Sequence, residues 1–270
     1  MPELADVEYF RQFFSRHAAG KQVAGVWVDP TILRNATPEI LEAALRGRRF
    51  EEPERLGKWL ICRTDGPVLL LHFGMTGDLI WSEEEPARHR HDRLIIEFVE
   101  GGELRYRNMR KLGGVWIVHD DDEQAGLLQA LGPDALSVGR LEFLARLGRR
   151  RGGLKAALMD QTFLAGVGNI LADEILWQAR LHPKTSIEDL SEQQRRDLHT
   201  AMRRVLREAV EKYDYISRKR SWLSNVRGLR DAACPRCGTR LERTVAGGRT
   251  TYFCPACQPA EAVRMIAKRK

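Results

Sequence analysis

Four of the five cysteines form two matched pairs near the end of the chain. Cys234 and Cys237 make one Cys-x-x-Cys knuckle, Cys254 and Cys257 make another, and 16 residues separate the knuckles. Two such knuckles can surround one ion with four thiolates in the closed tetrahedral arrangement that structural zinc prefers. A redox dithiol would need only one pair. The spacing therefore predicts a single structural Zn²⁺ with no open position for catalysis.

The spacer between the knuckles has the pattern of a β-hairpin. Two short segments, 241–245 and 250–253, have the length of hairpin strands, and Ala246-Gly247-Gly248-Arg249 supplies a turn signal between them. We therefore expect a zinc-bound hairpin with Arg249 near its tip. Cys62, the remaining cysteine, lies in a strand-like run and is expected to be a small buried hydrophobe.

A glycine turn in the middle of the chain could bind an anion. Gly166 and Gly168 precede Asn169, where a helix is expected to begin. Glycines let backbone N–H groups approach a ligand closely, and a helix N-terminus favours negative charge. The same residues would also suit an ordinary corner between two helices, so the turn by itself leaves both readings open.

The elements that must position these residues change character along the chain. After a helix at 4–19, residues 26–118 contain short strand-like runs separated by Gly, Pro and Asp turns, typical of a β-sandwich or barrel. After Gly132-Pro133 the periodicity becomes helical. We predict an α+β protein with a β-sandwich domain at 1–122, a helical domain at 133–228 and a zinc finger at 229–262.

Composition and charge exclude several classes. The chain has 270 residues, 43% of them hydrophobic, and no apolar run long enough to span a membrane or to begin a secretory signal. Residues 201–270 hold 17 Lys and Arg against 6 Asp and Glu, whereas the first 200 hold 27 against 31. A basic segment of this kind is typical of a nucleic-acid partner, although a merely solvated surface would look the same.

Three motifs, in this order along the chain, resemble one family. The start Met1-Pro2-Glu3-Leu4, the glycine turn at 161–177 and the zinc hairpin with its arginine resemble the formamidopyrimidine-DNA glycosylase / endonuclease VIII family. The resemblance implies a base-excision-repair DNA glycosylase with AP lyase activity. It also implies that the glycine turn belongs to a helix–two-turn–helix motif and that damaged duplex DNA is the partner of a monomeric, cytoplasmic, nucleoid-associated protein.

The resemblance also assigns roles to single residues. Pro2, exposed once methionine is removed, matches the amine nucleophile, and Glu3 matches the catalytic carboxylate. Lys58 and Arg249 match phosphate-binding members of the active site. The remaining DNA contacts, which hold the backbone or fill the space left by an extruded base, match His72, Met75, Arg110, Leu112, Lys155, Gly168 and Asn169.

The chain departs from the family pattern in three places. Ala5-Asp6 replaces the usual Pro-Glu, and residues 108–112, Asn-Met-Arg-Lys-Leu, replace Asp-Pro-Arg-Arg-Phe. Residues 217–232 lack the glycine-rich loop of the 8-oxoguanine-specific branch. The preferred lesion therefore stays open between oxidised purines, oxidised pyrimidines and abasic sites. Two alternatives to the enzyme are a catalytically weak or inactive member that binds damaged, abasic or single-stranded DNA, and a zinc-ribbon transcription or RNA factor.

Overall fold

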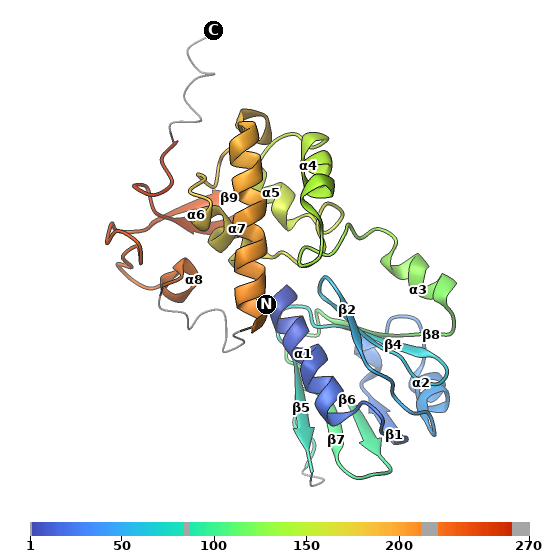
Figure 1. Cartoon of the computed structure of the whole chain (residues 1–270). Helices are drawn as coiled ribbons and strands as arrows, with labels where there is room; N and C mark the ends of the chain where they lie inside the picture. Colours follow the sequence, from blue (N-terminus) through green and yellow to red (C-terminus); the bar gives the residue numbers. More distant parts are fainter. Residues whose placement is uncertain (1, 84–86, 212–220, 261–270) are drawn as a thin grey trace. The chain divides into compact units, whose positions relative to one another are not determined.

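The computed structural model divides the chain into two compact units, residues 1–130 and 131–270 (Figure 1). It describes residues 2–83, 87–211 and 221–260. Each unit is treated by itself below. Residues 217–220 of the irregular basic segment and the last two residues of the predicted zinc-finger range lie outside the described residues.

Two four-stranded antiparallel sheets form the first unit. One sheet has the order β1-β6-β7-β5 and the other has the order β2-β3-β4-β8. The strands of the first sheet are β1 (Val23–Val28), β5 (Gly77–Ser82), β6 (Asp92–Phe98) and β7 (Glu103–Asn108). Those of the second are β2 (Glu54–Leu56), β3 (Trp59–Cys62), β4 (Val68–His72) and β8 (Gly114–Val118). The predicted β-sandwich is therefore confirmed.

One core joins both sheets with the leading helix α1 (Leu4–His17). Phe10 packs on Phe73 with ring centroids 4.3 Å apart, and Phe14 meets Phe50 edge-on at 5.0 Å. Cys62 is fully buried in this core, as expected. Burial of these aromatic side chains holds the N-terminus of the chain against the sandwich.

Three short helices complete this unit: the single turn η1 (Pro30–Ile32), α2 (Pro38–Leu45) and α3 (Asp121–Leu128). The acidic run from Asp120 to Glu123 begins α3 rather than forming a loop. Asp120 Oδ1 accepts a hydrogen bond from the Glu123 amide at 2.8 Å, and the acidic first turn complements the positive end of the helix dipole. Charge clustering alone does not distinguish a solvated turn from a helix N-terminus.

Helices and one hairpin form the second unit, which confirms the helical half of the prediction. The helices are α4 (Arg140–Gly148), α5 (Leu154–Met159), α6 (Asn169–Gln178), the single turn η2 (Ile187–Asp189), α7 (Glu192–Glu211) and α8 (Leu223–Val226). The hairpin consists of β9 (Glu242–Ala246) and β10 (Arg249–Phe253), paired antiparallel.

The helix α6 lies at the centre of this unit. Every residue from Leu171 to Trp177 is buried, so α6 is enclosed by α5, α7, α8 and β10. Asp173 and Glu174 are buried along with the apolar residues. Buried carboxylates require hydrogen-bonding or charged partners, and these partners determine how the surrounding segments are held. Within the described parts of the chain, we find no helix with the length and apolarity needed to cross a membrane.

Candidate functional site

The N-terminal residues are held in place by a helix cap. Glu3 is the N-cap of α1 and is 1% exposed, while Pro2 before it is only half-buried. The Glu3 amide donates to Asp6 Oδ2 at 2.7 Å, which closes a capping box. Asp6, one of the departures from the family pattern, therefore fixes the backbone that carries Pro2 and Glu3.

An arginine links this helix to the turn that carries Lys58. Arg55 is nearly buried, pairs with Glu8 of α1 at 3.0 Å and donates to the Gly57 carbonyl at 3.0 Å. Gly57 takes a positive φ of 59°, which lets the chain turn between β2 and β3. The predicted nucleophile and the predicted lysine are thus carried by segments that one ion pair connects.

His72 is held as a neutral ring beside Lys58. Its Nδ1 accepts from the Gly74 amide at 3.3 Å, and its ring centroid lies 5.0 Å from that of Trp59. Burial, with a further contribution from the Lys58 charge, lowers the pKa of His72 to about 4. At neutral pH His72 therefore has only Nε2–H to donate to a phosphate oxygen.

The predicted wedge residues lie on two neighbouring loops with exposed side chains. Leu112 is 54% exposed and Met75 is 38% exposed, so Leu112 is not a core residue. Arg110 is also exposed, and its Nη1 lies 3.2 Å from Met75 Sδ. Sequence reasoning missed Met109, which is 56% exposed in the same loop. The sequence did contain a signal for this residue, because Met109 stands where the family pattern has a proline.

Asn108 holds these two loops together. Its Nδ2 donates to the Phe73 carbonyl at 3.2 Å and to the Tyr106 hydroxyl at 2.7 Å. Its Oδ1 accepts from Thr76 Oγ1 and from the Lys111 amide, both at 3.0 Å. Asn108 is fully buried, and only an amide side chain can both donate and accept in this way. The Asn108 amide therefore sets the geometry of the loops that carry Met75 and Arg110.

The structure places Lys155 differently from the expectation of a phosphate contact. Lys155 is fully buried, and its Nζ lies 2.6 Å from Asp173 Oδ1. It also donates to Asn169 Oδ1 at 2.7 Å and to Thr251 Oγ1 at 2.5 Å. An ammonium with three partners and no exposed surface positions Asn169 and β10, so we now propose that Lys155 acts on DNA only through them.

The second unit brings the other predicted DNA contacts together. Asn169 Nδ2 donates to the Thr250 carbonyl at 3.2 Å, which ties the glycine turn to the residue after Arg249. Arg249 is exposed at the start of β10, and within the described residues its guanidinium forms no hydrogen bond or ion pair. Gly168 is the N-cap of α6 with extended backbone. These positions would suit two neighbouring phosphates.

Gln161 organises the glycine turn and was not found by sequence reasoning. Its Nε2 donates to the carbonyls of Met159 and Val167 at 2.8 and 2.9 Å, and its Oε1 accepts from the Gly166 amide at 3.0 Å. A single glutamine between two helices gives no sequence signal for such a role, because its partners are all backbone atoms.

The four cysteine sulfurs fit a zinc ion. All of them lie within 4.8 Å of one another, and Cys234–Cys257 and Cys237–Cys254 are 3.9 and 3.5 Å apart. Zinc–sulfur bonds of about 2.3 Å in a tetrahedron place sulfurs about 3.8 Å apart. Zinc would hold the hairpin against α6, where Arg236 lies over the Trp177 ring at 4.1 Å.

Pro2 and Glu3 on a β-sandwich, with a helical unit whose glycine turn is tied to a cysteine hairpin, are the features expected of a DNA-repair enzyme of the glycosylase class. Three sequence families match the chain in order. They are the formamidopyrimidine-DNA glycosylase N-terminal domain at residues 1–115, the H2TH domain of the same enzyme at 131–221, and the zinc finger found in FPG and IleRS at 233–260.

Whole proteins and solved structures agree with these matches. Formamidopyrimidine-DNA glycosylases of Herpetosiphon aurantiacus and Chloroflexus aurantiacus are 34% and 35% identical to this chain; each alignment covers 96% of it, and 100% and 98% of the relatives. The Lactococcus lactis enzyme bound to DNA with an abasic site superposes with a TM-score of 0.87 at 28% identity, covering 95% of this chain and 99% of that one. The chain belongs to the formamidopyrimidine-DNA glycosylase family and carries that family's structural zinc.

Replacing Asn108 with aspartate tests whether the Asn108 amide holds the two loops together. A carboxylate cannot donate to the Phe73 carbonyl, so Asn108→Asp should lower the free energy of unfolding by about 1–3 kcal/mol and change the dependence of excision on the opposite base. Urea unfolding and excision rates against four opposite bases measure both effects. Asn35→Asp is the matched control, because Asn35 donates to the Ile117 carbonyl outside these loops. An identical change in base dependence for both variants would contradict the assignment.

Lys155→Met separates a structural ammonium from a phosphate contact. Removal of the ammonium leaves Asp173 buried with Arg227 as its remaining cation, and we expect a loss of about 3 kcal/mol in unfolding free energy. The slope of log K for DNA against log salt should stay unchanged, whereas a lost phosphate contact would reduce it by about one. Lys184→Met, at an exposed lysine, is the stability control. A reduced slope with parental stability would restore the direct contact.

The lowered pKa of His72 predicts a pH-dependent stability. Between pH 6.5 and pH 4 the unfolded chain protonates this ring while the folded chain does not, so its contribution to stability falls as pH falls through that window. Between pH 7 and pH 4.5, the free energy of unfolding of His72→Asn should therefore fall by about 2 kcal/mol less than that of the parent, as measured by urea unfolding. His119→Asn, at an exposed ring, should follow the parent. Parallel profiles for the parent and His72→Asn would contradict the assignment.

Proposed function

We propose that this chain excises damaged bases from DNA and cuts the strand at the resulting abasic site, with the Pro2 amine as nucleophile. The observation that carries the proposal is the N-terminal Pro2-Glu3 dyad, with Glu3 buried and capped by Asp6 in a family member aligned over nearly its full length. A protein that only binds damaged DNA would gain nothing from this dyad, so the binding-only alternative is not favoured.

The chemistry follows from a secondary amine at a chain terminus. An α-amino group titrates at about 7.7–8.0, so a useful fraction is neutral at physiological pH. Attack of the neutral Pro2 nitrogen on C1′ forms an N–C bond and expels the damaged base with the bonding electron pair. The nitrogen then loses its N–H proton to solvent, its lone pair breaks the C1′–O4′ bond, and Glu3 supplies the proton that O4′ takes up. The resulting iminium acidifies the C2′ proton. Its loss drives β-elimination of the 3′ phosphate, and a second elimination releases the 5′ phosphate.

The remaining residues would hold the DNA for this reaction. Lys58, His72, Asn169 and Arg249 are proposed to contact phosphates beside the lesion. A second set, Met75, Arg110 and Leu112, with Met109 added by the structure, is proposed to fill the space left by the extruded nucleotide. Unstacking a base costs a few kcal/mol, and these exposed side chains would offset that cost.

The substrate class is inferred from the relatives. The Lactococcus lactis enzyme has been solved with DNA containing an abasic site and with DNA containing Fapy-dG, the latter in a structure with a TM-score of 0.86 at 27% identity. We infer that formamidopyrimidine guanine and abasic sites are substrates here as well. The relatives are bacterial repair enzymes, which supports action on chromosomal DNA inside the cell.

Blocking the N-terminus tests the nucleophile. Borohydride should trap the protein covalently on duplex DNA with an abasic site, and adding residues before Pro2 should abolish trapping because the attacking nitrogen becomes an amide. Binding to the same duplex should remain close to parental, since the proposed phosphate contacts lie elsewhere. Gel shift of the trapped complex and peptide mapping of the adduct give the readout.

Two further variants complete the design. Glu3→Gln should lose excision of formamidopyrimidine guanine more than cleavage of a preformed abasic site, because the abasic aldehyde is already reactive. Lys58→Met reports whether the lysine attacks instead. If the extended protein is still trapped, and if this trapping disappears when Lys58→Met is added, then Lys58 is the nucleophile and the proposal for Pro2 is wrong.

A further inference from the structure

Arginines gather between α4 and α7, away from any residue assigned above. A cavity of about 630 Å³ lies between the start of α4 and the middle of α7. Four arginines line it: Arg140 from α4, and Arg203, Arg204 and Arg207 from α7. His199, Thr200 and the carboxylates of Glu208 and Glu211 also line it, which leaves an excess of positive charge.

Two of these arginines are committed to the fold, in the sense that their guanidinium groups form hydrogen bonds within the protein, and the other two are not. Arg203 donates to the Leu136 carbonyl, and Arg204 donates to Gln178 Oε1 at 3.0 Å. Within the described residues, Arg140 and Arg207 form no hydrogen bond or ion pair, and both are exposed at the rim of the cavity. The committed arginines shape the cavity, and the uncommitted ones are available to a ligand.

The positive charges around this cavity contribute to lowered pKa values of two side chains that line it. Burial and then the charge of Arg207 lower the pKa of Arg203. Burial is also the main cause of the lowered pKa of His199, and the charges of Arg203 and Arg140 add to it despite a hydrogen bond to the Val138 carbonyl. Like charges held together weaken the folded state unless an anion compensates them.

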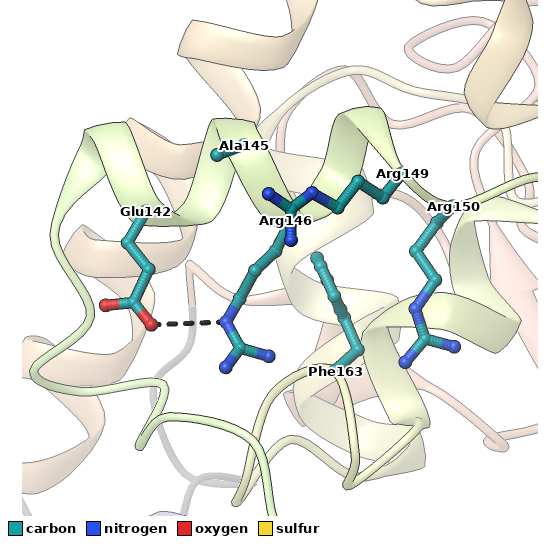
Figure 2. Close-up of a pocket in the computed structure, with 6 residues that line it drawn as sticks. All are labelled: Glu142, Ala145, Arg146, Arg149, Arg150 and Phe163. Carbon is teal, nitrogen blue, oxygen red and sulfur yellow. Dashed lines mark hydrogen bonds and ion pairs between the residues drawn. The ribbon is translucent and has the colours of Figure 1, made fainter.

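A second hollow of about 360 Å³, lined by a separate set of residues, lies against the other part of α4. Figure 2 shows Arg146, Arg149 and Arg150 around the ring of Phe163, with Arg146 paired to Glu142 at 3.1 Å. Arg150 is paired with Asp160, whereas Arg149 has no such partner within the described residues. Both ends of α4 thus carry an uncommitted guanidinium.

We propose that this α4–α7 arginine surface, defined by Arg140, Arg203, Arg204 and Arg207, binds phosphodiester groups of DNA as a second contact site. Arg140 and Arg207 would contact the phosphate oxygens, because a guanidinium is a planar fork that matches two of them and is weakly hydrated. Arg203 and Arg204 would add positive charge beside them. Gly139 and Arg140 at the start of α4 line the same cavity, and no side chain caps the backbone N–H groups of this helix start.

Two sources could supply the phosphodiesters, and both are DNA. The first is the flank of the same duplex that carries the lesion, in which case the surface lengthens the footprint. The second is a separate duplex, in which case the surface bridges two DNA molecules. The chemistry at the surface is the same, so duplex length and stoichiometry must distinguish the two.

The test removes the two uncommitted arginines at the first cavity. Arg140→Gln/Arg207→Gln leaves the hydrogen bonds of Arg203 and Arg204 intact. The matched control, Lys184→Gln/Arg196→Gln, removes two positive charges from exposed positions of the same unit that line neither cavity. Binding is measured by titration against salt with undamaged duplexes of about one and about four helical turns.

We expect the slope of log K against log salt to fall by about one to two in Arg140→Gln/Arg207→Gln and to stay parental in the control. A loss confined to the four-turn duplex at one duplex per protein identifies the flank as the source. Loss of a second bound one-turn duplex identifies a separate molecule. Borohydride trapping on a one-turn abasic duplex should remain parental, which keeps this proposal distinct from that for Pro2. Parental slopes with both duplexes would overturn the inference.

Discussion

One buried ion pair constrains much of the second unit. The Lys155 ammonium lies without exposed surface against Asp173, and Asp173 also pairs with Arg227 at 2.8 Å. A charge removed from water is tolerated only when its partners are in place, and here the partners come from α6, β10 and the segment after α8. The glycine turn and the zinc hairpin, which carry Asn169 and Arg249, are therefore formed as one arrangement. Neither can shift without leaving a charge uncompensated.

In the first unit a buried neutral side chain plays the role that the buried ion pair plays in the second. Asn108 satisfies two donors and two acceptors in a buried position, and through them it connects the loops of Met75 and Arg110. If these loops insert into DNA as proposed, a shape present before binding is an advantage, because ordering them during binding would cost conformational free energy. In both units a buried polar side chain, rather than regular secondary structure, holds the residues that we propose to contact DNA. The apolar cores supply stability, and the polar groups supply geometry.

Arginines in this protein fall into two kinds that composition does not distinguish. Arg55, Arg203 and Arg227 are bound to carboxylates or carbonyls and act as structural cross-links. Arg140, Arg207 and Arg249 are exposed and uncommitted within the described residues. Only arginines of the second kind are available to displace counterions from a nucleic acid. The net charge of a segment therefore does not measure how much of that segment can bind DNA. Arg140 lies outside the basic segment 201–270, whereas Arg203, Arg204 and Arg207 lie within it. A count of charges in these two parts of the chain therefore did not reveal the cluster between α4 and α7.

The sequence by itself determined the zinc ligands, the change from strands to helices and the family, because cysteine spacing, periodicity and motif order are local patterns. The bounds expected for the first helix and for the two strands of the zinc hairpin agreed within a few residues for the same reason. Only the tertiary structure decided that Lys155 is buried, that Asn108 and Gln161 organise loops, and that Leu112 is exposed. Each of these depends on which distant groups meet: Thr251 reaches Lys155 from 96 positions away, and Phe73 meets Asn108 from 35. A residue type specifies which hydrogen bonds a side chain can form, and the fold selects which of them it does form.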